Sequence, residues 1–335
     1  MKCTFVLKEK KYLILRGSQW CFIASENKEI FVFYIFDRAA ATFLWGDICL
    51  FGVNFVTLHV NSTTNESTMI EDLVSVIMPT YNASKFLADS IEGVLLQTYP
   101  QLELLITDDC SSDEATRQIL KYYQKKDSRV NVVFLKDNHG PGYARNQSIQ
   151  RAKGRYIAFC DSDDKWFPDK LEKQIAFIKE KGCCLVFSSY YRCSENGEII
   201  GYVNAPSRLT LKSLKHDNKI GCLTAMYDAK PYGKFYMPEL RKRQDWALFL
   251  SILKESHVAY ALKMPLALYR KTPYSISRQK TSLIKYNAQV YRMVFGYSKS
   301  KAYWYLYTIF LPSYATKKLQ NKLYSFVKPL PKLHP

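Results

Sequence analysis

Short apolar segments recur at regular intervals from residue 73 onward. Four of them are rich in branched residues and have the length of buried strands: 73–78, 102–107, 130–135 and 155–160. Polar residues follow each segment, and apolar residues then return every three or four positions, which is the spacing of a helix. The pattern therefore predicts four strands that alternate with helices.

Residues that favour helix starts stand in front of these helical patterns. Asn82 precedes the first, Ser111 or Ser112 precedes the second, and Pro168 opens the helix after the fourth strand. The third helix is expected across residues 143–152. The residues predicted to face the sheet are Phe86, Leu87, Ile91, Val94 and Leu95 in the first helix, and Ala115, Ile119 and Tyr122 in the second.

This order of elements predicts an α/β fold, with a mainly parallel sheet flanked by helices on both faces. Ligands of such sheets bind beyond the carboxyl ends of the strands. Candidate binding residues follow three of the four strands. They are Pro79, Thr80 and Tyr81 after the first, Asp108 and Asp109 after the second, and Asp161, Asp163 and Asp164 after the fourth.

The pattern changes after residue 182. Residues 183–191 and 198–203 are predicted strands joined by a hairpin, because Asn-Gly lies between them. A strand near 222–227 and a helix near 244–254 follow. This mixed half is the expected place for a second substrate.

The charge of the chain is concentrated at its end. The formal net charge is +18, and from Ser256 onward there are fourteen Lys and Arg but no Asp or Glu. A solvated basic face and a nucleic-acid surface are alternatives, but no nucleic-acid motif accompanies the charge. Basic residues mixed with Trp and Tyr favour the surface of an anionic membrane. The apolar run 303–312 is too short to span a bilayer, which needs about 20 residues.

The beginning of the chain carries no recognisable motif. The apolar run near the N-terminus is interrupted by charged residues, so it does not resemble a signal peptide. Residues 1–68 are either an accessory segment or the result of a start assigned too early, with Met69 as the alternative. The nine cysteines show no C-x-x-C spacing, which favours reduced thiols in the cytoplasm.

The acidic residues after the fourth strand indicate a bound cation. Carboxylates crowded into one loop repel each other and raise one another's pKa values, so a positive group is expected beside them. Asp161 and Asp163 offer hard oxygen ligands, which suit Mg²⁺ or Mn²⁺, and Mg²⁺ is commonly held by one or two carboxylates plus substrate phosphates. The alternative is that the loop only caps the helix that Pro168 opens.

Several motifs occur here in the order found in family 2 glycosyltransferases with the GT-A fold. VSVIMPTYN, LLITDDCSSD, NHGPGYARN and CDSDDKWFPDKL resemble the nucleotide-sugar half of that family, and RKRQDWALFL resembles its acidic motif before a helix. The resemblance covers residues 72–280. It implies a transferase domain at 69–280, with a nucleotide-binding half at 72–182 and an acceptor half at 183–280. Residues 281–335 form the basic, aromatic C-terminal segment, which is expected to be helical.

The resemblance also assigns roles to individual residues. Arg145 would face the nucleotide or its diphosphate, and Asp245 would be the catalytic base. YRKTPYSIS (269–277) would close over the diphosphate. Pro79, Thr80 and Tyr81 would lie near the nucleoside, Asp108 and Asp109 would contact it, and Asp161 and Asp163 would carry the metal.

Three positions depart from the family pattern. Cys110 replaces a Gly, Gln244 replaces a Glu, and Thr272 replaces a frequent His, which removes a histidine contact from that segment. Each assigned role also has a plain structural alternative. Asp109 could cap a helix, Arg145 could pair with an acid on its own helix, and Asp245 could be a favourable charge at a helix N-terminus.

The implied activity is transfer of a sugar, with inversion, from a UDP-sugar or similar donor to a hydroxyl of a glycan or lipid-linked acceptor. The implied setting is O-antigen-like or capsule-like polysaccharide synthesis at the inner face of the cell membrane. Two alternatives remain. One is a non-catalytic binding protein with a decayed transferase fold. The other is an NAD-dependent oxidoreductase, because Gly140 and Gly142 open a helix and Asp161 ends the next strand.

Overall fold

The structure is a computed structural model. It describes residues 2–7, 10–16, 20–24, 30–34, 69–272, 280–316 and 319. The chain divides into two compact units, Met1–Ser67 and Thr68–Pro335. Across the described ranges, no helix is both long and apolar enough to cross a membrane.

The first unit contains a four-stranded antiparallel sheet. Each described strand pairs with the next along the chain, so these four strands form a simple meander. Its strands are β1 (Lys2–Leu7), β2 (Lys10–Arg16), β3 (Trp20–Ala24) and β4 (Ile30–Tyr34).

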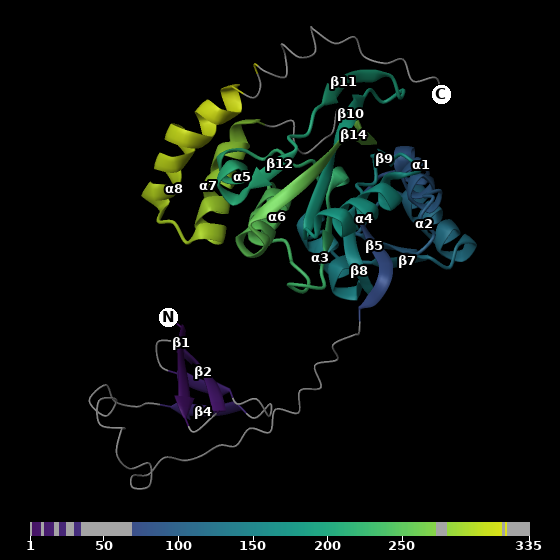
Figure 1. The fold of residues 1–335 in the computed structure, drawn as a ribbon. Helices are drawn as coiled ribbons and strands as arrows, with labels where there is room; N and C mark the ends of the chain where they lie inside the picture. Colours follow the sequence, from purple (N-terminus) through teal and green to yellow (C-terminus); the bar gives the residue numbers. More distant parts are fainter. Residues whose placement is uncertain are drawn as a thin grey trace. The chain divides into compact units, whose positions relative to one another are not determined.

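The second unit is built on a ten-stranded sheet, shown in Figure 1. Its first four strands lie parallel in the order β8-β5-β6-β7, which confirms the predicted strands and their alternation with helices. The strands are β5 (Ile70–Thr80), β6 (Leu102–Asp108), β7 (Val130–Phe134) and β8 (Gly154–Phe159). The helices between them are α1 (Ser84–Leu95), α2 (Glu114–Lys126) and α3 (Pro141–Arg151).

The other strands extend this sheet beyond β8. The short strand β13 runs antiparallel to both β8 and β10, and β10 runs parallel to β14. The predicted hairpin is confirmed, because β11 returns antiparallel along β10. The bounds are β9 (Lys165–Trp166), β10 (Leu185–Cys193), β11 (Ile199–Val203), β12 (Arg208–Thr210), β13 (Met226–Asp228) and β14 (Val258–Arg270).

Helices cover both faces of this sheet. Val76 and Met78 belong to a core cluster with α1, α2 and α4, whereas Ile77 belongs to a second cluster with α3 and α6. Successive strand residues point to opposite faces, so this alternation defines two layers of helices. The remaining helices are α4 (Lys170–Lys181), α5 (Leu211–His216), α6 (Gln244–Ser256), α7 (Lys280–Phe295) and α8 (Lys299–Tyr305).

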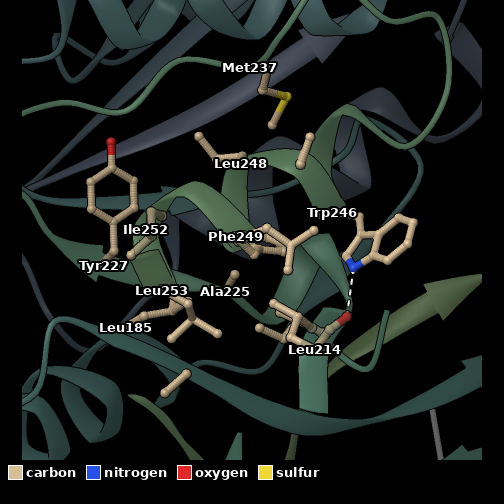
Figure 2. Close-up of a cluster of buried hydrophobic side chains, with 14 of the residues drawn as sticks. Leu185, Leu214, Ala225, Tyr227, Met237, Trp246, Leu248, Phe249, Ile252 and Leu253 are labelled. Atoms are coloured by element: carbon tan, nitrogen blue, oxygen red, sulfur yellow. Dashed lines mark hydrogen bonds between the residues drawn. The ribbon is translucent and has the colours of Figure 1, made fainter. Parts of the chain in front are cut away.

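Helix α6 is the centre of the second core cluster. Eight of its thirteen residues are buried, so it is enclosed on nearly all sides. Figure 2 shows Trp246, Phe249 and Leu253 of this helix among side chains from β10, α5 and β13. Helices α7 and α8 pack beside α5 and α6, as Figure 1 shows, so the described part of the C-terminal segment joins this core.

Several local predictions were wrong. Pro168 does not open α4, which begins at Lys170 after Asp169. The predicted strand near 222–227 begins as a 3₁₀ turn, Cys222–Thr224, before β13. Asp113 caps α2, because its side chain accepts a hydrogen bond from the Ala115 N–H, so neither Ser111 nor Ser112 does so. The buried face of α2 is also shifted by one residue from the predicted one. It consists of Thr116, Leu120 and Tyr123, whereas Tyr122 is 57% exposed.

Candidate active site

The loop after β5 is fastened to the loop after β6. Asn82 has a left-handed backbone (φ 46°), and its side-chain oxygen accepts hydrogen bonds from the N–H groups of Ser112 (2.9 Å) and Asp113 (3.1 Å). It therefore joins two loops and does not cap α1, whose N-cap position is Ala83. Beside it, Thr80 is buried with its hydroxyl unpaired, and Tyr81 is 51% exposed. These residues form one wall of the sheet edge.

The two acids after β6 are both buried, and each holds a different turn. Asp108 accepts hydrogen bonds from the hydroxyl and the N–H of Ser111, which stabilises the left-handed turn at Cys110 (φ 63°). Asp109 accepts from the N–H groups of His139 (2.8 Å) and Gly140 (2.7 Å). Asp109 therefore fixes the loop that leads into α3 and does not cap α2.

Helix α3 directs two neighbouring side chains to different parts of the site. The Arg145 guanidinium is 6% exposed and forms an ion pair with Asp161 in the loop after β8. The side chain of Asn146 exchanges two hydrogen bonds, both of 2.8 Å, with the backbone of Met237. Arg145 thus pairs with an acid outside its own helix, and Asn146 ties α3 to the segment before α6.

The loop after β8 carries two further acids, Asp163 and Asp164, besides Asp161, which pairs with Arg145. Burial and the neighbouring Asp161 raise the pKa of Asp163 to about 6. Asp164 is buried. One of its oxygens accepts from the Arg270 N–H (3.0 Å), while the other has no partner. Burial, followed by the charges of Asp163 and Asp161, raises the pKa of Asp164 well above its usual range.

Arg270, at the end of β14, supports this acidic loop through several hydrogen bonds. Its Nε donates to the carbonyl of Asp163 (3.1 Å), and its terminal nitrogens donate to the Glu195 carbonyl (3.3 Å) and to Asp89 (2.7 Å). The guanidinium also lies over the Phe86 ring, 4.2 Å from its centroid. Sequence reasoning missed this role, because nothing in the local pattern around Arg270 points to residues more than a hundred positions away.

Asp245 approaches the same region from the other half of the sheet. It lies in the first turn of α6, and the Asn218 side-chain amide donates to its Oδ2 (3.3 Å). Burial lowers the pKa of Arg145. The carboxylates of Asp161 and Asp245 raise it by more, so the pKa of Arg145 lies above its ordinary value. The α3 start also packs closely on the α6 start, since a Cβ at Gly142 would lie 3.3 Å from Gln244 Cγ.

The charges of Arg145, Asp161 and Asp245 all act on the Cys222 thiol. Burial raises the pKa of this thiol well above the usual range. The charge of Arg145 opposes that rise, and the charges of Asp161 and Asp245 add to it. One thiol therefore responds to acids from both halves of the sheet. Trp166 and Trp246 are buried and pack in the interior.

The acidic loop has the right chemistry for a divalent cation. In the described ranges, no three His, Cys, Asp or Glu side chains are grouped to hold a metal by themselves. The loop nevertheless offers carboxylate oxygens from Asp161 and Asp163, beside an Asp164 oxygen without a partner. Two carboxylates completed by substrate phosphates are a common way to bind Mg²⁺. Residues 273–277, predicted to close over a diphosphate, lie outside the described residues.

The fold and the site define a class of protein. The chain superimposes on residues 1–349 of TarS from S. aureus, solved with UDP-GlcNAc, with a TM-score of 0.55 and 24% identity. The match covers 68% of this chain and 69% of that one. This likeness establishes the GT-A glycosyltransferase fold, a mainly parallel sheet flanked by helices.

The chain belongs to Glycosyl transferase family 2, which matches residues 75–234. It is 44% identical over 233 residues to TuaG of Bacillus subtilis (strain 168), a glycosyltransferase named for teichuronic acid biosynthesis. That match covers 69% of this chain and 92% of TuaG. It is 37% identical over 218 residues to the Escherichia coli UDP-Glc:alpha-D-GlcNAc-diphosphoundecaprenol beta-1,3-glucosyltransferase WfgD, covering 65% and 84%. The protein is therefore a glycosyltransferase, and the oxidoreductase alternative is wrong.

Proposed function

We propose that this protein transfers a sugar, with inversion, from a UDP-sugar to a hydroxyl of a lipid-linked oligosaccharide during synthesis of a bacterial surface polysaccharide. One observation carries the proposal. Arg145 of α3 forms an ion pair with Asp161 of the nucleotide-binding half, and the start of α3 packs on the start of α6, where Asp245 of the acceptor half lies. The named donor and acceptor of WfgD and the named pathway of TuaG support the substrate classes.

The donor nucleotide lies along the edge formed by β5, β6 and α3. Pro79, Thr80 and Tyr81 line the nucleoside site, and the Tyr81 side chain, which is 51% exposed, is the one that a ligand can contact directly. Asp108 contributes by shaping the loop. Asp109 already accepts two backbone hydrogen bonds, but a carboxylate has about four acceptor positions, so it can also accept one from a base N–H.

Asp161 and Asp163 would hold the divalent cation, Mn²⁺ or Mg²⁺, together with oxygens of the diphosphate. When bound, it supplies Lewis-acid stabilisation of charge on the departing diphosphate. Arg145 is placed to leave Asp161 for a diphosphate oxygen, because its guanidinium is a planar, permanently charged donor. Arg270 keeps the backbone of Asp163 in place.

Asp245 takes the proton of the acceptor hydroxyl. The hydroxyl oxygen forms its bond to the anomeric carbon as the bond from that carbon to the diphosphate oxygen breaks on the opposite face, which inverts the configuration. Asn218 orients the base by donating to Oδ2, which leaves Oδ1 for the hydroxyl. A positioned base of this kind contributes roughly 10²- to 10⁴-fold.

A lipid-linked acceptor requires the enzyme to work at a membrane. We place the protein in the cytoplasm, peripheral at the inner face of the cell membrane, held there by the basic C-terminal segment and not by nucleic acid. Fourteen Lys and Arg without a single Asp or Glu after Ser256 support this placement.

A donor screen tests the proposal. Nucleotide release is followed for a panel of nucleotide-sugars with Mn²⁺, and a UDP-sugar is expected to give the fastest release. A folded protein that hydrolyses no donor would favour the alternative of a decayed, non-catalytic transferase. UDP titrations with and without Mn²⁺ test the metal site, because Asp163→Ala should abolish the gain in UDP affinity that Mn²⁺ gives the unmodified chain.

A further inference from the structure

Helix α8 and the π-helical turn that continues it, Leu306–Phe310, present two different apolar faces. The inner face consists of Ala302, Leu306 and Phe310, which are spaced four residues apart and buried. The outer face carries Trp304, which is 61% exposed, and Tyr307, which is 54% exposed. Packing against the rest of the protein accounts for the inner face only.

The outer face is larger than these two side chains. The Tyr303 ring stacks on Tyr307 with 6.4 Å between centroids. Tyr314 does not belong to this face, because its ring stacks on Phe310 of the inner face with 6.2 Å between centroids. Single exposed apolar residues are ordinary, but neighbouring large aromatics on one surface indicate an interaction site. Trp and Tyr are the residues enriched where protein meets the boundary between lipid and water.

The charge around this face has one sign. Lys299 and Lys301 are exposed beside Trp304, Lys285 and Arg292 are exposed on α7, and residues 280–316 contain no Asp or Glu. A second copy of the chain, paired face to face, would bring these like charges together. An anionic lipid surface instead offers negative charge and an apolar interior to the same residues.

We propose that this outer aromatic face, consisting of Trp304 and Tyr307 with Lys299 and Lys301, rests on an anionic bilayer. The proposal rests on the proposed function, since it names the surface that presents the lipid-linked acceptor. It also goes beyond net charge, because it assigns contact to one side of one helix. The inner face of the same helix contacts the residue beside the base. The centroids of the Phe310 and Trp246 rings are 5.3 Å apart, and Trp246 directly follows Asp245.

The lipid-facing helices are firmly joined to the acceptor half. The Lys215 ammonium, at the end of α5, lies over the rings of Phe295, Tyr297 and Tyr305, with 4.4, 4.7 and 4.6 Å to their centroids. Trp246 donates a hydrogen bond of 2.9 Å to the Leu214 carbonyl, drawn in Figure 2. A helix bound at the bilayer would therefore hold the start of α6 in a fixed relation to the lipid.

Vesicle binding of the full chain tests this assignment. Flotation is measured with vesicles of phosphatidylglycerol and phosphatidylcholine, and with phosphatidylcholine alone. Trp304→Ser with Tyr307→Ser should lower the partition coefficient on the anionic vesicles by about tenfold or more. Lys299→Gln and Lys301→Gln should lower it about fivefold for each charge removed.

Matched changes on α1 and α2 serve as controls. Leu96 and Tyr122 are 70% and 57% exposed, so Leu96→Ser with Tyr122→Ser removes similar exposed groups elsewhere and should leave vesicle binding unchanged. Lys121→Gln with Lys125→Gln is the matched charge control. UDP binding without vesicles, measured in parallel, should be the same in every variant. Failure of UDP binding alone would count against the proposed function and leave this face standing.

Three results would overturn the proposal. The first is unchanged flotation of the Trp304, Tyr307 double variant. The second is an equal loss in the control variants, which would show that any exposed aromatic or charge contributes. The third is a Trp304, Tyr307 double variant that keeps vesicle binding but loses another interaction. Loss of self-association would assign the face to a second copy of the chain, and loss of binding to single-stranded nucleic acid would assign it to nucleic acid.

Discussion

Residues 69–182 and residues 183–316 hold their parts of the site by different means. In the first region, polar side chains fix the loops: Asn82 joins two of them, Asp109 holds the start of α3, and Arg145 pairs with Asp161. In the second region, aromatic side chains do this work. Trp246 is enclosed by Tyr291 and Phe310, with ring centroids at 5.5 and 5.3 Å.

The difference matches what each region is proposed to bind. A nucleotide diphosphate needs hydrogen-bond donors and charges in fixed positions, so loops that are already bonded to one another suit it. The proposed base needs only one carboxylate held at a set place, and dense packing below it is sufficient. Substitutions in the first region should therefore alter donor binding. Substitutions in the second should alter turnover or stability, except at Arg270, whose side chain contacts the acidic loop of the first region.

The largest effect is expected at Asp245. Asp245→Asn removes the proton acceptor and keeps the shape of the side chain, so turnover should fall by roughly 10²- to 10⁴-fold. UDP affinity should stay within about twofold, because the donor residues are on the other region. Steady-state kinetics and UDP titration measure the two quantities.

Glu114→Gln is the matched control for that change. Glu114 is also an acid in the first turn of a helix, so it has the same favourable position relative to the helix dipole. Its substitution should leave turnover unchanged. If Asp245→Asn behaves like Glu114→Gln, then Asp245 is only a helix charge.

The packing of the second region is tested by Phe310→Ala. The side chain is 2% exposed, so its removal leaves a cavity beside Trp246 and should cost about 3–5 kcal/mol of unfolding free energy. Urea denaturation followed by Trp fluorescence measures the loss. Thr308→Ala, at an exposed position on the same turn, should stay within about 0.5 kcal/mol. Similar losses in both variants would mean that the contact with Trp246 has no special weight.

A smaller effect is expected at Arg270 in the support of the acidic loop. Arg270→Gln removes the contacts of the guanidinium with Asp163 and Asp89 and keeps the N–H that binds Asp164. Loss of one charge-assisted bond costs about 1.5–3 kcal/mol, so Mn²⁺-dependent UDP affinity should fall about tenfold. Arg129→Gln is the control, because Arg129 binds Asp127 and the Leu95 carbonyl and makes no contact with the acidic loop. Equal effects of the two variants would remove Arg270 from the site.

The smallest effect concerns the buried Lys170 of α4, whose ammonium donates to Gln174 and lies 3.8 Å from the centroid of the Trp166 ring. Burial lowers its pKa to about 7, from 10.5. Above pH 7 the folded chain has therefore lost this proton while the unfolded chain keeps it, so stability rises with pH. Relative to Lys170→Met, the unmodified chain should gain about 1 kcal/mol between pH 7 and pH 8. A constant difference across that range would show that the lysine keeps its proton in the fold.

The comparison also shows how far sequence reasoning reached. The four parallel strands and the acids that follow them were predicted correctly, because strand period and strand-end residues are local properties. The face of α2 was predicted wrongly, because Ala115, Ile119 and Tyr122 have the same helical spacing as Thr116, Leu120 and Tyr123, and only packing against the sheet decided that the second set is buried. The predicted start of the strand near 222–227 was also wrong, because the 3₁₀ turn at Cys222–Thr224 depends on neighbouring segments and not on the local sequence pattern.

By itself, the sequence determined which residue types stand at the strand ends, and so it determined the fold class and the acidic chemistry of the site. Only the tertiary structure decided which of those residues meet. It brought Arg270 behind Asp163, Asn218 against Asp245, and the inner face of α8 and its π-helical turn onto Trp246. The physical reason is that periodicity reflects burial within one element, whereas these contacts join residues between 27 and 107 positions apart, and the closing of the sheet sets them.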